Sequence, residues 1–392
     1  MMNNNLSEVF ESNSNIENMM KHTRRDCTAV AVSVVVGDQI LFQKTSGSIG
    51  SHSDFPASNE NTAFLLASIT KTFLAVICLQ CIERNQIDLD ADINTYTWNE
   101  SNARKRYPAV QVMNPHFPDA SITIRHLLTH RSGLTDDERA LEEGSKWRTE
   151  NDDSPISLYE YVSRRLVPGN TDYDSFIWNR RDPPGAARYS YSNAGFALLG
   201  FVIEQATGES LNDLAHRDIF KPLNMKHTDY FLSFFRKPEN ADCQVALPHW
   251  SPVEPMNHYC VAEWPACQIR STLGDLTRYL LAFTGPTCPL LRDQSLLQVL
   301  MPENMTNGLA WWGKDSQYGD KSGAFWAHGG FMEGVRTHIY LFPEQRNPGE
   351  DASSLLPLSR QRKGIIILTN GSGDYEYVFQ AARKGLRSLP SE

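Results

Sequence analysis

Apolar residues along this chain fall into runs of two lengths. Short runs rich in β-branched residues occupy 28–36 and 39–44, on either side of Gly37-Asp38, and this pattern predicts a β-hairpin. Two further runs of strand length, 337–342 and 364–368, lie near the C-terminus. Longer runs at 68–84 and 196–206 predict helices, and the first is apolar nearly all round, so we expect it to be buried.

Strand-like runs at both ends of the chain, with helices between them, indicate an α/β (α+β) fold. We predict a central antiparallel sheet from the N- and C-terminal parts, flanked by helices and closed by a helix over about 374–386. Residues 1–25 read as an N-terminal helix or arm, and 26–392 as a single domain with a mainly helical subdomain at about 94–190. Aromatic residues of that subdomain form either a lid or its own core: Trp147, Tyr159, Tyr161, Tyr173, Phe176 and Trp178.

Composition narrows the class of protein. The chain has 392 residues, of which 41% are hydrophobic and 21% charged, as is usual for a globular protein. A net charge of −9 argues against nucleic acid as a partner, and no apolar run has the length of a membrane span. The N-terminus lacks a secretory signal pattern and the seven cysteines are scattered, so we expect a cytoplasmic protein with reduced thiols.

Candidate chemistry appears where the helix at 68–84 begins. Ser68-Ile69-Thr70-Lys71 places a hydroxyl and an amine one helical turn apart on the same face. A serine is a weak nucleophile unless a base lies beside it, and a buried lysine can be that base. Taken alone, the same four residues also fit an ordinary first turn of a helix.

Two later motifs strengthen the catalytic interpretation. Tyr191-Ser192-Asn193 precedes the helix at 196–206, and His328-Gly329-Gly330 precedes the strand at 337–342. Ser-x-x-Lys, Tyr-x-Asn and His-x-Gly in this order resemble the serine β-lactamase and penicillin-binding-protein superfamily. The Tyr-x-Asn form is similar to the class C branch and its esterase, D-aminopeptidase and transesterase relatives. The resemblance extends over 122–134 and 271–276, and it implies a β-lactamase/transpeptidase-like fold.

The resemblance also implies roles for individual residues. Ser68 is the nucleophile, and Lys71 and Tyr191 together form the base; which of the two takes the proton stays open. Asn193 orients Lys71 or holds a substrate carbonyl. The oxyanion hole, two N–H groups that stabilise the negatively charged oxygen of the reaction intermediate, is expected at the backbone of Ser68 and Phe331. Gly329 and Gly330 let the strand pass close to the substrate.

Two departures from the family pattern affect the expected substrate. His328 stands where many relatives carry lysine, and a neutral imidazole binds a carboxylate less firmly than an ammonium group does. Cys267-Gln268 replaces a Gly-Gly pair that relatives often have, which reshapes one wall of the site. We therefore expect a roomy apolar site that favours small acyl esters over penicillins and cephalosporins.

The sequence thus predicts a serine hydrolase or acyltransferase that forms an acyl-enzyme on Ser68 from an ester, amide or peptide substrate. Two alternatives remain: a catalytically silent member kept as a binding or scaffold protein, and a true β-lactamase or D-Ala peptidase. No cofactor and no metal are expected, although His126 and His130 have the i, i+4 spacing of zinc ligands. The sequence does not determine the oligomeric state.

Overall fold

The computed structural model describes residues 13–50, 56–98, 106–136, 142–300, 308–314, 325–342 and 362–389. Its main sheet has six strands in the order β11-β12-β13-β14-β1-β2, and every neighbouring pair is antiparallel. The strands are β1 (Ala29–Val36), β2 (Gln39–Gly47), β11 (Trp312–Lys314), β12 (Phe325–Met332), β13 (Val335–Phe342) and β14 (Lys363–Thr369).

The main sheet joins the two ends of the chain, as predicted. β1 forms the expected hairpin with β2 and pairs on its other side with β14, where Val32 lies opposite Ile367. All eight residues of β1 are buried, because both faces of the sheet are covered. The His328 motif precedes the expected strand, β13, but it also lies within a further strand, β12, which the sequence did not predict because the two glycines interrupt the apolar pattern that marks strands.

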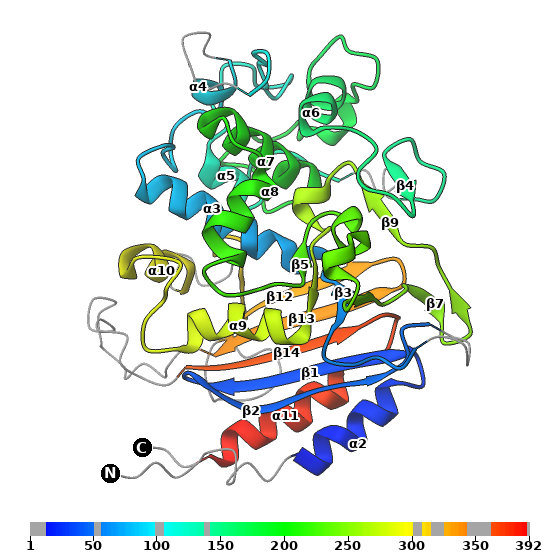
Figure 1. The fold of residues 1–392 in the computed structure, drawn as a ribbon. Coiled ribbons are helices and arrows are strands. Elements are labelled where there is room, and N and C mark those ends of the chain that lie inside the picture. The colour runs from blue at the N-terminus through cyan, green and yellow to red at the C-terminus, as the bar shows by residue number, and fades with distance from the viewer. Residues whose placement is uncertain are drawn as a thin grey trace.

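One face of the main sheet is covered by the two terminal helices. Figure 1 shows α2 (Asn13–Thr23) and α11 (Glu376–Ser388) side by side beneath the strands. Ile16 and Met20 of α2 and Val378 and Phe379 of α11 share a hydrophobic cluster with the strand residues that point to this face. The first helix of the described residues is therefore packed onto the sheet.

The opposite face of the sheet supports α9 and, beyond it, a helical layer (Figure 1). A single large hydrophobic cluster connects this sheet face with the buried sides of these helices. The layer contains the two helices that the long apolar runs predict, α3 and α7. The helices on this side are α3 (Thr70–Glu83), α4 (Asn94–Thr97), α5 (Ile124–Leu128), α6 (Leu158–Leu166), α7 (Asn193–Thr207), α8 (Leu211–Ala215), α9 (Leu273–Thr284) and α10 (Asp293–Leu300).

Short strands connect the main sheet to the helical layer. A four-stranded sheet has the order β5-β10-β3-β6, and β4 pairs with β9 and β7 with β8. Sequence periodicity did not reveal these strands because each has only two to four residues. Their bounds are β3 (Thr62–Leu65), β4 (Arg148–Glu150), β5 (Thr228–Asp229), β6 (Gln244–Val245), β7 (His249–Ser251), β8 (Glu254–Pro255), β9 (Tyr259–Val261) and β10 (Arg270–Thr272).

The aromatic residues that suggested a lid are mostly core residues. Trp147, Tyr161 and Trp178 are buried in the large hydrophobic cluster, and Tyr159 and Tyr173 pack against it. Of the six, only Phe176 is strongly exposed, at 77%. The part of the candidate lid at 137–141 lies outside the described residues.

Among the described residues, no helix combines the length and the apolar character that a membrane crossing requires.

Candidate active site

Ser68 lies at the point where a strand turns into the buried helix α3. β3 ends at Leu65, a 3₁₀ turn follows over Ala67–Ile69, and α3 starts at Thr70. Ala67, directly before the serine, has a φ of 49°, in the left-handed region that alanine rarely occupies. Such a conformation persists only where the surrounding structure holds it in place, and it often accompanies functional sites.

Strand β12 holds this turn in place through a glycine. A Cβ atom added to Gly330 would lie 2.3 Å from the carbonyl oxygen of Leu66 and 2.1 Å from Oγ1 of Thr337. The Thr337 hydroxyl donates a hydrogen bond of 2.6 Å to the same Leu66 oxygen. The absence of a side chain at position 330 therefore lets β12 and β13 pack directly against the Ser68 turn.

Lys71 is fully buried and makes three hydrogen bonds. Its Nζ donates to Ser68 Oγ at 3.2 Å, to Asn193 Oδ1 at 2.6 Å and to the carbonyl oxygen of Ala266 at 3.1 Å. Burial disfavours the charged amine and lowers the pKa of Lys71 to about 8, against an opposing effect of nearby acidic groups. Burial thus shifts Lys71 toward its neutral amine, the form that can take a proton.

Tyr191 approaches Ser68 from the other side. Its hydroxyl donates a hydrogen bond of 2.6 Å to Ser68 Oγ, and its ring stacks on His130 with centroids 4.5 Å apart. Lys71 Nζ lies 4.6 Å from the centroid of the tyrosine ring. Burial nevertheless raises the pKa of Tyr191 far above its usual value. Burial therefore favours the neutral phenol of Tyr191 over the phenolate, although a neighbouring ammonium group would favour the phenolate.

Asn193 is the first residue of α7, and its side chain is fixed from both ends. Its Oδ1 accepts the hydrogen bond from Lys71, while its Nδ2 donates to Asp136 Oδ2 at 2.8 Å. The backbone N–H of Asn193 donates to Asp136 Oδ1 at 2.5 Å. Asp136 belongs to none of the three motifs, and no local pattern in the sequence connects it with Asn193, 57 positions away.

His328 lies in β12 beside the catalytic candidates and is 2% exposed. Its Nδ1 is 2.9 Å from the carbonyl oxygen of Gly329, which assigns the ring proton to that nitrogen. Burial, together with the charge of Lys71, lowers the pKa of His328 to about 3. The ring is consequently neutral, and its Nε2 is buried without a hydrogen-bond partner among the described residues.

Aromatic side chains line the site next to His328. The ring of Trp312 lies 6.1 Å from that of Tyr191, 5.3 Å from that of Tyr189 and 6.5 Å from that of His328. Trp312 is 40% exposed, so part of its surface is open to a ligand. Phe331, whose backbone follows the two glycines, is also exposed, but its side chain contacts His338 and Arg336.

A second carboxyl group that the sequence analysis did not single out, Glu263, acts on the charge of Lys71. Glu263 is buried and accepts a hydrogen bond from the hydroxyl of Tyr161. Burial and the nearby charge of Asp136 raise the pKa of Glu263 to about 8. The neighbouring Cys267 and Gln268, which replace the small pair of relatives, are buried as well, so the wall they form is closed and packed.

The two histidines with zinc-like spacing have structural partners. His126 Nδ1 accepts the N–H of Thr123 as part of the cap of α5, and His130 Nδ1 accepts the N–H of Ser192. Both rings thus use one nitrogen to stabilise the backbone.

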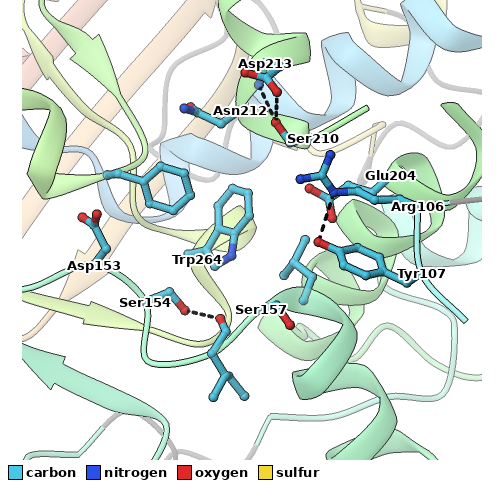
Figure 2. Close-up of a pocket in the computed structure, with 13 residues that line it drawn as sticks. Arg106, Tyr107, Asp153, Ser154, Ser157, Glu204, Ser210, Asn212, Asp213 and Trp264 are labelled. Atoms are coloured by element: carbon cyan, nitrogen blue, oxygen red, sulfur yellow. Dashed lines mark hydrogen bonds between the residues drawn. The ribbon is translucent and has the colours of Figure 1, made fainter. Parts of the chain in front are cut away.

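A separate cavity of about 470 Å³ lies in the helical layer, between the starts of α6 and α8. Figure 2 shows Trp264 in the middle of its lining side chains, with Arg106, Tyr107 and Glu204 on one side and Asp153 on the other. Ser68, Lys71 and Tyr191 do not line this cavity. It is therefore distinct from the serine site, although Trp264 belongs to the same turn as Ala266, which binds Lys71.

Ser68 thus contacts a buried lysine and a tyrosine, between the main sheet and the helical layer (Figure 1). The sequence model of the Beta-lactamase family matches residues 13–387, and the chain belongs to this family. A solved octameric penicillin-binding protein homologue from Pyrococcus abyssi has the same fold. The two superpose with a TM-score of 0.71 at 19% identity, over 96% of this chain and 79% of that one.

Curated relatives match the chain at somewhat higher identity but over a smaller part of their own length. Beta-lactamase-like protein 2 of Dictyostelium discoideum is 23% identical over 326 residues, which are 79% of this chain and 53% of the relative. Esterase EstB of Burkholderia gladioli is 28% identical over 212 residues, or 52% of this chain and 47% of the relative. The chain therefore spans about half the length of the curated relatives it matches.

Proposed function

We propose that the protein hydrolyses or transfers the acyl group of an ester or amide through an acyl-enzyme on Ser68. The observation that carries this proposal is the position of Ser68 Oγ, which lies 3.2 Å from Lys71 Nζ and 2.6 Å from the Tyr191 hydroxyl. An amine with a lowered pKa and a phenol, both within hydrogen-bond reach, provide a base and a proton carrier for the serine.

The lowered pKa of Lys71 favours its neutral amine as the base that takes the Ser68 proton. As Oγ forms a bond to the substrate carbonyl carbon, this proton moves to Nζ. The bond from that carbon to the leaving oxygen or nitrogen then breaks, and the leaving group takes a proton from Tyr191, which Lys71 re-protonates. Water or another alcohol or amine attacks the ester on Ser68 by the reverse route, which releases the acid or the transferred product.

Two backbone N–H groups complete the proposed chemistry. We assign the oxyanion hole to the N–H of Ser68 and of Phe331, because Gly330 brings β12 against the Ser68 turn. Asn193 is assigned to hold Lys71 in place, a role that its hydrogen bond of 2.6 Å supports.

The neutral His328 favours a substrate without a carboxylate at this position. An ammonium group would form a charge-assisted hydrogen bond with the carboxylate of a β-lactam, and a neutral imidazole does not. The partly exposed Trp312 adds apolar surface beside Tyr191. Together with an esterase among the relatives, these features favour small neutral acyl esters over penicillins and cephalosporins.

Mass spectrometry of the intact protein tests the proposal. Wild type and Ser68→Ala are incubated with p-nitrophenyl acetate and butyrate, a D-Ala-D-Ala peptide and nitrocefin, and quenched in acid. We expect wild type to gain the mass of one acyl group from the esters and Ser68→Ala to gain none, with turnover abolished and the thermal melting unchanged. Turnover by Ser68→Ala within about tenfold of wild type would refute the nucleophile.

The same experiment separates the alternatives. A folded wild type that gains no mass from any of these substrates supports a silent binding or scaffold protein. Preference for nitrocefin over the p-nitrophenyl esters places the chain among true β-lactamases.

A further inference from the structure

Asp136 holds both the backbone and the side chain of Asn193. Asp136 Oδ1 accepts the N–H groups of Asn193 and Ala194, at 2.5 and 3.4 Å, and its Oδ2 accepts Asn193 Nδ2 at 2.8 Å. A carboxylate can only accept hydrogen bonds, so it must face the NH₂ end of the asparagine amide. The oxygen end is thereby turned toward Lys71.

The orientation of this amide decides whether Lys71 keeps the shortest of its three hydrogen bonds. With Oδ1 facing Lys71, Nζ has an acceptor at 2.6 Å and lies between that oxygen, Ala266 and Ser68. If the amide turned over, two donors would face each other and Lys71 would lose this contact. A neutral or apolar residue at position 136 would leave both orientations open.

The charge of Asp136 acts on Lys71 as well. Two carboxyl groups, those of Asp136 and Glu263, act on the charge of Lys71. Burial raises the pKa of Glu263 to about 8, which favours its protonated form at neutral pH. Burial raises the pKa of Asp136 as well, but the charge of Lys71 and the N–H groups of Asn193 and Ala194 oppose that rise by favouring the carboxylate. With these donors beside it, Asp136 is the carboxylate that offsets the Lys71 charge, and it opposes the effect of burial on the pKa of that amine.

We propose that Asp136 is a positioning residue of the Ser68 site, which fixes the orientation of the Asn193 amide and supplies the negative charge opposite Lys71. This inference rests on the proposed function but adds a residue outside the three family motifs. The effect of pH must take into account the other titratable groups that interact with Lys71, with Asp136 or with both. These groups are Glu263, Cys267, Tyr161, Tyr189, Tyr191, His130 and His328.

An exchange of the two side chains tests the orientation. Asp136→Asn places an NH₂ group against the NH₂ of Asn193, and Asn193→Asp places two carboxyl groups side by side. The double variant Asp136→Asn/Asn193→Asp restores a donor facing an acceptor, and an oxygen again faces Lys71. We expect each single variant to lose about tenfold or more in kcat/KM on p-nitrophenyl butyrate, and the double variant to regain most of that loss.

The dependence of activity on pH tests the charge. Asp136→Asn removes a negative charge that acts on Lys71, so the pKa of the amine falls and the rising limb of the kcat/KM profile moves to lower pH. In the double variant the negative charge lies directly against Lys71, and the limb moves to higher pH than in Asp136→Asn. Ser157→Ala, which removes the cap of α6, is the matched control and should leave the profile unchanged.

Three results would overturn the inference: kcat/KM of Asp136→Asn within about twofold of wild type, a double variant no better than the single variants, or an unchanged profile in Asp136→Asn. A merely structural cap would lower the melting temperature and leave the profile in place. If Asp136→Asn does not fold, the inference is tested by kcat/KM of the double variant alone. A double variant that folds but is inactive then refutes the inference. Wild type is acylated in parallel, so that failure of the Ser68 chemistry itself is recognised separately.

Discussion

The helices α3 and α11 have similar lengths but opposite relations to solvent. Every residue of α3 from Thr70 to Cys81 is buried, whereas α11 buries one face on the sheet and exposes the other. The aromatic residues near their starts show the difference. Phe73 is fully buried and stacks on Tyr279 at 3.9 Å, while Tyr377 is 51% exposed and meets the ring of His22 at 4.9 Å.

This difference explains why the candidate chemistry is found at α3. An amine on the exposed face of α11 would keep its hydration, whereas Lys71 loses hydration and with it part of its affinity for a proton. The burial that makes substitutions in α3 destabilising thus also lowers the pKa of Lys71, and the lowered pKa lets its amine act as a base. Each prediction below tests this contrast, beginning with the largest expected change in free energy.

The largest effect is expected in folding stability. Phe73→Ala leaves a cavity beside Tyr279 of α9 and Phe220, and it should lower the free energy of unfolding by about 3–5 kcal/mol. Tyr377→Ala is the matched control on α11 and should cost less than about 1 kcal/mol, since it removes one partly exposed ring contact. Urea denaturation of both variants measures the difference, and equal losses would contradict the contrast between the helices.

The next effect concerns proton transfer at the start of α3. Lys71→Ala and Tyr191→Phe should each reduce kcat at least ~10²-fold, because each removes a group in direct contact with Ser68 Oγ. The double variant should be little worse than either single variant, since groups that act as one unit are not additive. Ester hydrolysis under saturating substrate measures the three values. Losses that simply multiply would mean that the two residues act independently.

A smaller effect is expected from the charge at position 328. His328→Lys introduces an ammonium group that can bind a carboxylate, a contact worth roughly 1–3 kcal/mol. The ratio of kcat/KM for nitrocefin to that for a p-nitrophenyl ester should therefore rise about fivefold or more. His328→Gln, which is polar and uncharged, is the control and should leave the ratio near that of wild type. A fall in the ratio for His328→Lys would contradict the proposed role of a neutral residue at this position.

The most gradual effect is the dependence of activity on pH. Because burial lowers the pKa of Lys71 to about 8, the reactive neutral amine becomes scarcer as pH falls below that value. We expect kcat/KM for an ester without titratable groups to fall about tenfold per pH unit well below pH 8 and to level off above it. A rising limb near the ordinary pKa of lysine would show that burial does not act on this amine as the structure indicates.

Much of the fold and the site was determined by the sequence itself. The hairpin at β1 and β2, the strand β14 and the helices α3, α7 and α11 follow from the arrangement of apolar residues. Burial of one face leaves a periodic pattern, and burial of all faces leaves an unbroken apolar run, as in α3. Ser68 and Lys71 lie three residues apart at a helix start, and this local spacing is enough to bring them together. The three motifs in order predicted the family, and the family comparison confirms it.

The tertiary structure alone decided what lies across from these residues. Asp136 and Glu263 act on Lys71 from segments far away in the sequence. Asp136 follows the isolated bridge between Leu134 and Trp178, and Glu263 follows the three-residue strand β9, so neither segment has a periodicity to read. The state of each group depends on burial: the neutral ring of His328, the lowered pKa of Lys71 and the neutral phenol of Tyr191 all arise from loss of water. Hydration is a property of the packed molecule, so residue types and spacing could predict which groups take part but not which of them carry charge.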